Sequence, residues 1–237
     1  MKTAIRVLMI VSIILLIICV VGLIVLLVLP SNNVSDYTDT DKPVINDVND
    51  VVLSETADAG QAYIDKLYFV GDSTTLHFSK AGIERSHLLV PSSHTLMLDS
   101  DIDEVTVGDS GLTISEYLKK EDAKIVIITV GVNGADRFTE TRYKTYYKKL
   151  IKSIKDTSPN TTVILQSVFP VTEDYSSQNI GITNEGINRL NEWVKEIAFD
   201  EGLKYLDTQS ILKNENGAQI LDSVSYTHLT LPTMAVV

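Results

Sequence analysis

The sequence has little cysteine and a deficit of positive charge. One cysteine among 237 residues excludes an internal disulfide framework and a cysteine-rich metal module. Lysine and arginine number 20 against 31 acidic residues, and the resulting net charge of −11 argues against nucleic acid as a partner, because phosphate binding needs clustered cations. No cluster of ligand residues implies a metal or an organic cofactor. The sequence does have a hydrophobic excess, and it is concentrated in the first thirty residues.

An uncharged apolar run extends from Val7 to Leu29. As a helix it would be about 34 Å long, enough to cross a bilayer core of about 30 Å. Lys2 and Arg6 precede it, so the positive-inside rule places the N-terminus in the cytoplasm and the rest of the chain outside. The alternative is a cleaved signal peptide, whose apolar region is usually about 7–15 residues long. The run therefore predicts a single-pass anchor within residues 1–30, with the cell membrane as a partner through residues 7–29.

Residues 31–53 are polar and acidic and are predicted to be a flexible linker. From residue 54 to residue 223, strand and helix patterns alternate, which predicts one α/β domain. The expected fold is a three-layer α/β/α sandwich with a mostly parallel, flavodoxin-like sheet. Strands are expected at 67–70, 124–130, 162–169 and 203–206, and helices at 54–66, 139–156, 182–201 and after a capping box formed by Thr113 and Glu116.

A row of basic residues follows the predicted helix 139–156. It runs from Arg142 to Lys155 at spacings that share one helix face. We interpret this row as a solvated face of the helix. A binding surface for an anionic partner is the alternative.

The tripeptide Gly71-Asp72-Ser73 comes directly after the first predicted strand. A serine at the carboxyl end of a strand, where the chain turns into a helix, lies near free helix N–H groups that stabilise negative charge. The tripeptide alone is weak evidence, because the chain contains it again as Gly108-Asp109-Ser110. A strand-ending turn with local caps is the alternative for either copy.

Two further segments strengthen the interpretation of the first copy. Ser110-Gly111 stands before the predicted capping box, and the segment 131–134 (Gly-Val-Asn-Gly) follows the strand 124–130. Together with 71–73, and in this order, these blocks resemble the SGNH, or GDSL-type, hydrolase family over about residues 54–222. Gly134 stands where that family often has aspartate.

The resemblance implies a role for each matching residue. Ser73 would be the nucleophile, and its backbone N–H would help to form the oxyanion hole. The N–H of Gly111 and the side chain of Asn133 would complete the hole, which stabilises the charge of a tetrahedral intermediate. Supporting positions are Gly71, Asp72 and Gly131.

The last block of the family, Asp-x-x-His, has no clear match. Asp222 and His228 are six residues apart rather than three. Residues 224–237 resemble the translation of an adapter used in DNA library preparation, so they are predicted to be a non-native tail, and the catalytic domain is predicted to be truncated. The alternative is a genuine last block with altered spacing, in which His228 is the base. The earlier histidines match no family block: His77, His87 and His94.

The combined expectation is a membrane-anchored, extracytoplasmic serine esterase of the SGNH type. Its substrate would be an acyl ester, with O-acetyl groups on carbohydrate as one candidate. Without its base, Ser73 would have little nucleophilicity, and this chain would be inactive. Two alternatives are a binding or scaffold domain that kept the fold without catalysis and an O-acyltransferase acting on cell-envelope glycans.

Overall fold

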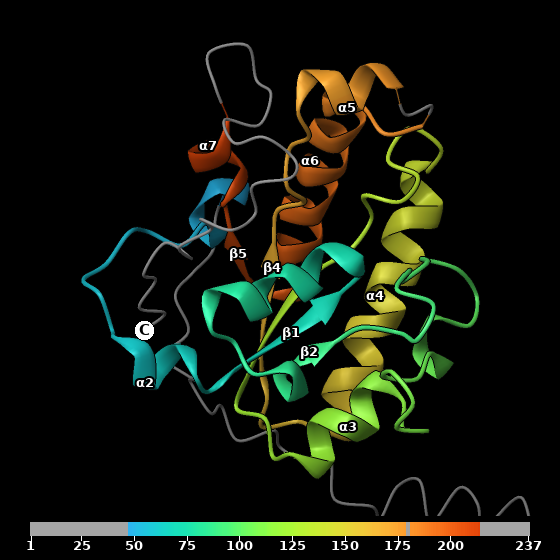
Figure 1. Ribbon diagram of the computed structural model, residues 1–237. Coiled ribbons are helices and arrows are strands. Elements are labelled where there is room, and N and C mark those ends of the chain that lie inside the picture. The colour runs from blue at the N-terminus through green and yellow to red at the C-terminus, as the bar shows by residue number, and fades with distance from the viewer. Residues whose placement is uncertain (1–46, 179–180, 214–237) are drawn as a thin grey trace, which may run out of the picture. The chain divides into compact units, whose positions relative to one another are not determined.

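The computed structural model describes residues 47–178 and 181–213. They form an α/β domain around a five-stranded sheet in which every neighbouring pair is parallel (Figure 1). The strand order β2-β1-β3-β4-β5 is the flavodoxin-like one, so the predicted class and sheet type are confirmed. The strands are β1 (Leu67–Gly71), β2 (Leu88–Leu89), β3 (Ile125–Thr129), β4 (Thr162–Gln166) and β5 (Lys204–Leu206).

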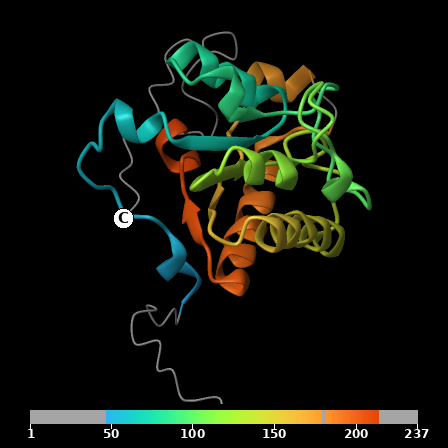
Figure 2. The same cartoon turned by 90° about the horizontal axis from the view of Figure 1, so that it is seen from below.

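Helices cover both faces of the sheet. Figure 2 shows α3, α4 and α6 on one side of β1 and η2 on the other. The α-helices are α2 (Gln61–Ile64), α3 (Ile114–Lys120), α4 (Glu140–Thr157), α5 (Glu173–Gln178), α6 (Asn184–Glu201) and α7 (Gln209–Leu212). The 3₁₀ helices are η1 (Val48–Val51), η2 (Ser73–Ala81), η3 (Arg85–His87) and η4 (Ile102–Glu104).

Side-chain alternation along the strands creates two cores. In β1, Tyr68 and Val70 face one way and pack with residues of α3, α4 and α6, whereas Leu67 and Phe69 face the other way. The second core includes Phe78 from η2, whose ring lies 5.0 Å from that of Phe69. Because both faces are buried, the strands are mostly apolar, as parallel strands usually are.

The long helices begin and end where their caps predict. Thr139 is the N-cap of α4, and Thr183 is the N-cap of α6, which ends at Gly202 in the left-handed region. The capping box of Thr113 and Glu116 at the head of α3 is confirmed.

The lysines of α4 form ion pairs with acidic side chains. Lys148 lies 2.8 Å from Asp200 of α6, and Lys144 is paired with both Glu140 and Glu196. The interpretation of this row as a simply solvated face is therefore incomplete, because much of it pairs with the neighbouring helix. Each such half-exposed pair contributes no more than about 1 kcal/mol.

Two predicted boundaries are wrong. The helix expected at 54–66 is confined to α2, because Gly60 has a φ of 77° and its N–H is bound by the Asp58 carboxylate at 2.6 Å, an arrangement that interrupts the helix. The strand expected at 162–169 ends with Gln166. Gln166 pairs with Leu206, the last residue of β5, so the ladder ends where the neighbouring strand ends.

The linker boundary also needs correction. Residues 47–53, predicted to be linker, lie in the domain: Val51 is completely buried, and the N–H of Leu53 donates to the carbonyl of Tyr205 at 2.8 Å. The predicted membrane span 7–29, Asp222, His228 and the predicted tail 224–237 lie outside the described residues. Within 47–178 and 181–213, no helix has the length and apolarity needed to cross a bilayer.

Candidate active site

The chain turns sharply at the carboxyl end of β1. Only glycine fits at position 71, because a Cβ atom on Gly71 would lie 2.8 Å from the carbonyl oxygen of Thr129. Asp72 then caps η2, its Oδ1 accepting hydrogen bonds from the N–H and the hydroxyl of Thr74 at 3.0 and 2.7 Å. The exposed Ser73 is therefore fixed as the first residue of η2.

A second turn follows β3, the neighbour of β1 in the sheet. Gly131 has a φ of 127°, which disfavours any residue with a side chain, and a Cβ atom there would also lie 2.8 Å from the ring of Tyr143. Two residues later, the Nδ2 of Asn133 donates to the Oδ2 of Asp72 at 3.2 Å. The structure therefore brings together Asp72, Ser73 and Asn133 from sequence blocks about sixty residues apart.

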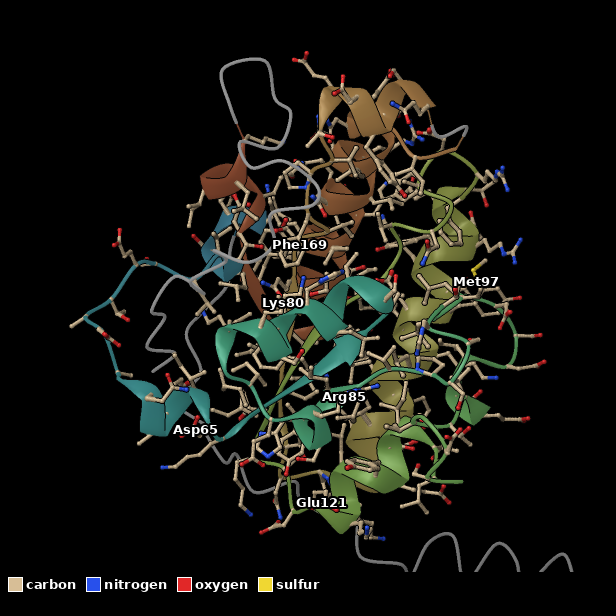
Figure 3. The ribbon with its side chains drawn as sticks, viewed as in Figure 1. Asp65, Lys80, Arg85, Met97, Glu121 and Phe169 are labelled. Carbon is tan, nitrogen blue, oxygen red and sulfur yellow. The ribbon has the colours of Figure 1, made fainter. Side chains whose placement is uncertain are left out.

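Ser73 and Asn133 line a pocket of about 260 Å³. It lies at the carboxyl ends of β1, β3 and β4, where β2 and β3 flank β1 on opposite sides, and ligands of such sheets bind at this switch point. Its wall is mostly apolar and includes Phe169, which Figure 3 labels. The other apolar lining residues are Val130, Val132, Val168, Pro170, Val171 and Ile182.

Asp72 is the charged group of the site and is almost completely buried. Burial raises the pKa of its carboxyl, although the hydrogen bonds from Thr74 act in the opposite direction. As an acceptor, Asp72 fixes which end of the Asn133 amide faces it. An amide nitrogen carries two N–H groups, so one remains for a ligand in the pocket.

The backbone N–H of Ser73 already has an acceptor. It donates to the carbonyl of His94 at 2.8 Å, and His94 itself has a positive φ of 56° in a turn closed by a bond to Pro91. The N–H predicted to contribute to the oxyanion hole is therefore already bound in this structure, and that role would require the bond to His94 to open. Nothing in the sequence signalled the contact, because it joins two loops that are distant along the chain.

Gly111 does not join the other predicted residues. It is exposed, has a φ of 69° and lies shortly before the N-cap of α3, and it is not among the residues that line the Ser73 pocket. In the second Gly-Asp-Ser copy, Asp109 accepts a hydrogen bond from Ser92 at 2.8 Å near the surface. The two copies thus differ sharply in burial.

No described histidine lines the pocket. His77 lies within η2, where burial and the nearby Lys80 lower its pKa, and His87 stacks on Tyr68 with ring centres 4.3 Å apart. The described ranges also contain no group of three or more metal-ligating side chains. A general base is therefore absent from the described part of the site.

A buried polar network lies beneath the pocket. The hydroxyl of Thr129 donates to Gln166 at 2.7 Å, and Gln166 in turn donates to Thr208 at 3.3 Å. Ser167 shares a hydrogen bond of 2.9 Å with the same threonine. This network fastens the segment after β5 to the ends of β3 and β4.

The chain matches a known protein family and resembles several solved structures. The family model for GDSL-like lipases and acylhydrolases matches residues 69–235. Among solved structures, a GDSL-like lipase from Bacteroides thetaiotaomicron is 17% identical with a TM-score of 0.45, and the match covers 71% of this chain and 78% of that one. The periplasmic domain of a lipopolysaccharide acetyltransferase from Salmonella ser. Paratyphi A is 15% identical with a TM-score of 0.40, covering 74% and 85%. Among curated proteins none matches.

Proposed function

Since the chain belongs to the GDSL-like lipase/acylhydrolase family, we propose that it is a serine esterase whose nucleophile is Ser73. The observation that carries the proposal is the shared pocket: Ser73 and Asn133 line one cavity with an apolar wall at the switch point of the sheet. The second serine of the same motif, Ser110, does not line it. This difference supports the first Gly-Asp-Ser copy, rather than the second, as the one that takes part in the reaction.

In the proposed reaction, the Oγ of Ser73 attacks the ester carbonyl and the alcohol leaves. An N–H of Asn133, held by Asp72, stabilises the charge on the carbonyl oxygen. Water then releases the acyl group from Ser73. Gly111 would contribute a second N–H only after its segment moves toward the pocket, and the Ser73 N–H only after leaving His94.

The proton of Ser73 needs a base. We assign this role to a histidine of the native C-terminal region, which the network at Thr208 would direct toward the pocket. Asp222 and His228 are not proposed as the native pair, because their spacing departs from the family pattern and residues 224–237 resemble a translated adapter. Sequencing the gene across codons 215–237 tests this assignment.

The size of the pocket supports a short acyl group. The cavity of about 260 Å³ is small for a ligand site. An acetyl group fits with room to spare, and so does a butyryl group. An O-acylated carbohydrate of the cell envelope would suit a domain held outside the membrane by residues 7–29.

The test compares two serines in protein that carries its native C-terminus. Ser73→Ala is expected to lower kcat for p-nitrophenyl butyrate by about 10⁴-fold or more. Ser110→Ala, the same change in the second Gly-Asp-Ser copy, is expected to leave kcat within twofold of the unmodified protein. Unchanged activity of Ser73→Ala would overturn the nucleophile assignment. Product analysis with an added acceptor alcohol separates hydrolysis from acyl transfer.

A further inference from the structure

A second pocket adjoins the Ser73 pocket. Its volume is about 390 Å³, and Asn133 and Ile182 line both cavities. The two cavities therefore adjoin at Asn133 and Ile182. Met97, labelled in Figure 3 beside α4, belongs to this second pocket, whereas Phe169 belongs to the first.

The two pockets differ in charge. The first has a mostly apolar wall, and its one ionisable carboxyl, Asp72, is buried beneath it. The second is lined by the guanidinium-bearing Arg137 and Arg142 together with Phe138, and none of its described lining residues is acidic. We call this second cavity the arginine pocket.

The nearest acidic side chains along the chain have other partners. Asp136 accepts a hydrogen bond from Thr183 at 2.7 Å and lies 3.9 Å from Arg189, and Glu140 is paired with Lys144 at 2.6 Å. They are therefore engaged away from the arginine pocket.

Arg142 differs from the lysines on its own helix. Lys144, Lys148, Lys149 and Lys152 of α4 each pair with an acidic side chain, whereas Arg142 pairs with none in the described part of the chain. It also lies in the first turn of α4, where a cation interacts unfavourably with the helix dipole.

Arg137 is packed closely against the opposite loop. A Cβ atom on Gly181 would lie 2.9 Å from its Nε, so the absence of a side chain at Gly181 allows this approach. The Arg137 side chain thus lies against the loop at Gly181 while the residue stays exposed and accessible to a ligand.

Resting on the esterase function proposed above, we propose that the arginine pocket binds an anionic group, phosphate or carboxylate, on the alcohol part of the ester. Guanidinium groups bind both anions through paired, charge-assisted hydrogen bonds. The acyl part would occupy the apolar Ser73 pocket, since that wall offers no partner for an anion. The site thus selects esters that are apolar on the acyl side of the carbonyl and negatively charged on the other.

The catalytic test uses esters that share one acyl group. In protein with its native C-terminus, kcat/KM is compared for 1-butyrylglycerol, its 3-phosphate and the butyryl ester of glyceric acid. The phosphate ester is expected to be preferred over the neutral ester roughly tenfold, and the carboxylate ester less, because phosphate offers more acceptors to two arginines. Arg142→Gln is expected to reduce that preference roughly fivefold, and Arg142→Lys to restore part of it. Lys152→Gln removes a charge from the same helix outside the pocket and should leave all three values unchanged.

A binding experiment separates this proposal from the esterase function. Glycerol 3-phosphate is expected to bind the protein by calorimetry, and to bind less at high salt, whereas glycerol is not. The double variant Arg137→Gln/Arg142→Gln, checked for an unchanged melting temperature, should lose this binding while Lys152→Gln keeps it. Binding without hydrolysis of any ester would refute the esterase function and keep the anion site. Hydrolysis with no preference for the charged esters, or binding that survives the double variant, would refute the anion site.

Discussion

The hydrogen bond between Asp72 and Asn133 predicts that changing Asp72 will lower the catalytic rate. In Asp72→Asn, the side-chain oxygen still accepts from Thr74, so the cap of η2 is kept. The group facing Asn133 changes from an acceptor to an NH₂ donor. Two donors then face each other, and the Asn133 amide is expected to turn over and withdraw its N–H from the pocket.

The size of the effect follows from these contacts. Loss of one oxyanion donor lowers kcat by about 10²–10³-fold, while the KM for a neutral ester is expected to change little. The free energy of unfolding should change by less than about 1 kcal/mol, since the capping bonds persist and the buried charge is removed. Steady-state kinetics with p-nitrophenyl butyrate and urea unfolding measure the two quantities.

Two further variants test whether Asp72 acts by positioning Asn133. Asp109→Asn alters the exposed aspartate of the second Gly-Asp-Ser copy and should leave kcat unchanged. Asn133→Ala should lower kcat about 10²-fold, and adding Asp72→Asn to it should lower kcat no further, because the two residues act through one interaction. Additive losses in the double variant, or normal kcat in Asp72→Asn, would show that Asp72 does not position Asn133.

Further predictions concern the turns around the pocket. Gly131→Ala should cost about 2–4 kcal/mol of unfolding free energy by urea titration, because the new Cβ overlaps the ring of Tyr143. Gly134→Ala, which also has a positive φ but meets only an ordinary contact at 3.6 Å, should cost less, and equal costs would contradict the overlap. Tyr143→Phe removes the buried hydroxyl that donates to the carbonyl of Val130 at 2.7 Å, and should cost about 1–3 kcal/mol in the same assay. Because burial raises the pKa of Asp72, the folded state keeps that proton to higher pH than the unfolded chain, so stability should fall as pH rises through the raised pKa. Asp72→Asn should lack that fall in unfolding titrations that start at about pH 4, near the ordinary pKa of aspartate, and proceed upward.

The sequence predicted the elements whose patterns are strong and local. The strand 124–130 and the helices 139–156 and 182–201 agree with β3, α4 and α6 to within a few residues. The strand was marked by a continuous apolar run, and the helices by apolar residues at helical spacing. The two residues of β2 are too short to carry a period. The helix expected from residue 54 does not form before Gly60, because Gly60 has a positive φ and its N–H donates to the Asp58 carboxylate.

The sequence predicted those parts of the site that lie close together because their strands are neighbours in the sheet. Ser73 and Asn133 follow neighbouring parallel strands, so their blocks meet at one edge of the sheet. The bond from the Ser73 N–H to His94 and the position of Gly111 outside the pocket depend on how long loops pack, which no local pattern encodes. The arginine pocket was likewise hidden, because Arg142 looked like one member of a lysine-rich row.

The pairing of residues 52–53 with β5 is expected to protect the domain from aggregation through its sheet edge. The exposed edge of a parallel sheet is a template on which another chain can add a strand. At one edge the strand β2 is only two residues long, and at the other the N–H of Leu53 and a bridge from Val52 to Tyr205 occupy β5. A protein that began at Ser54, where composition placed the start of the domain, would leave that second edge open. Such a shortened protein should be more prone to aggregation than one that retains residues 47–53.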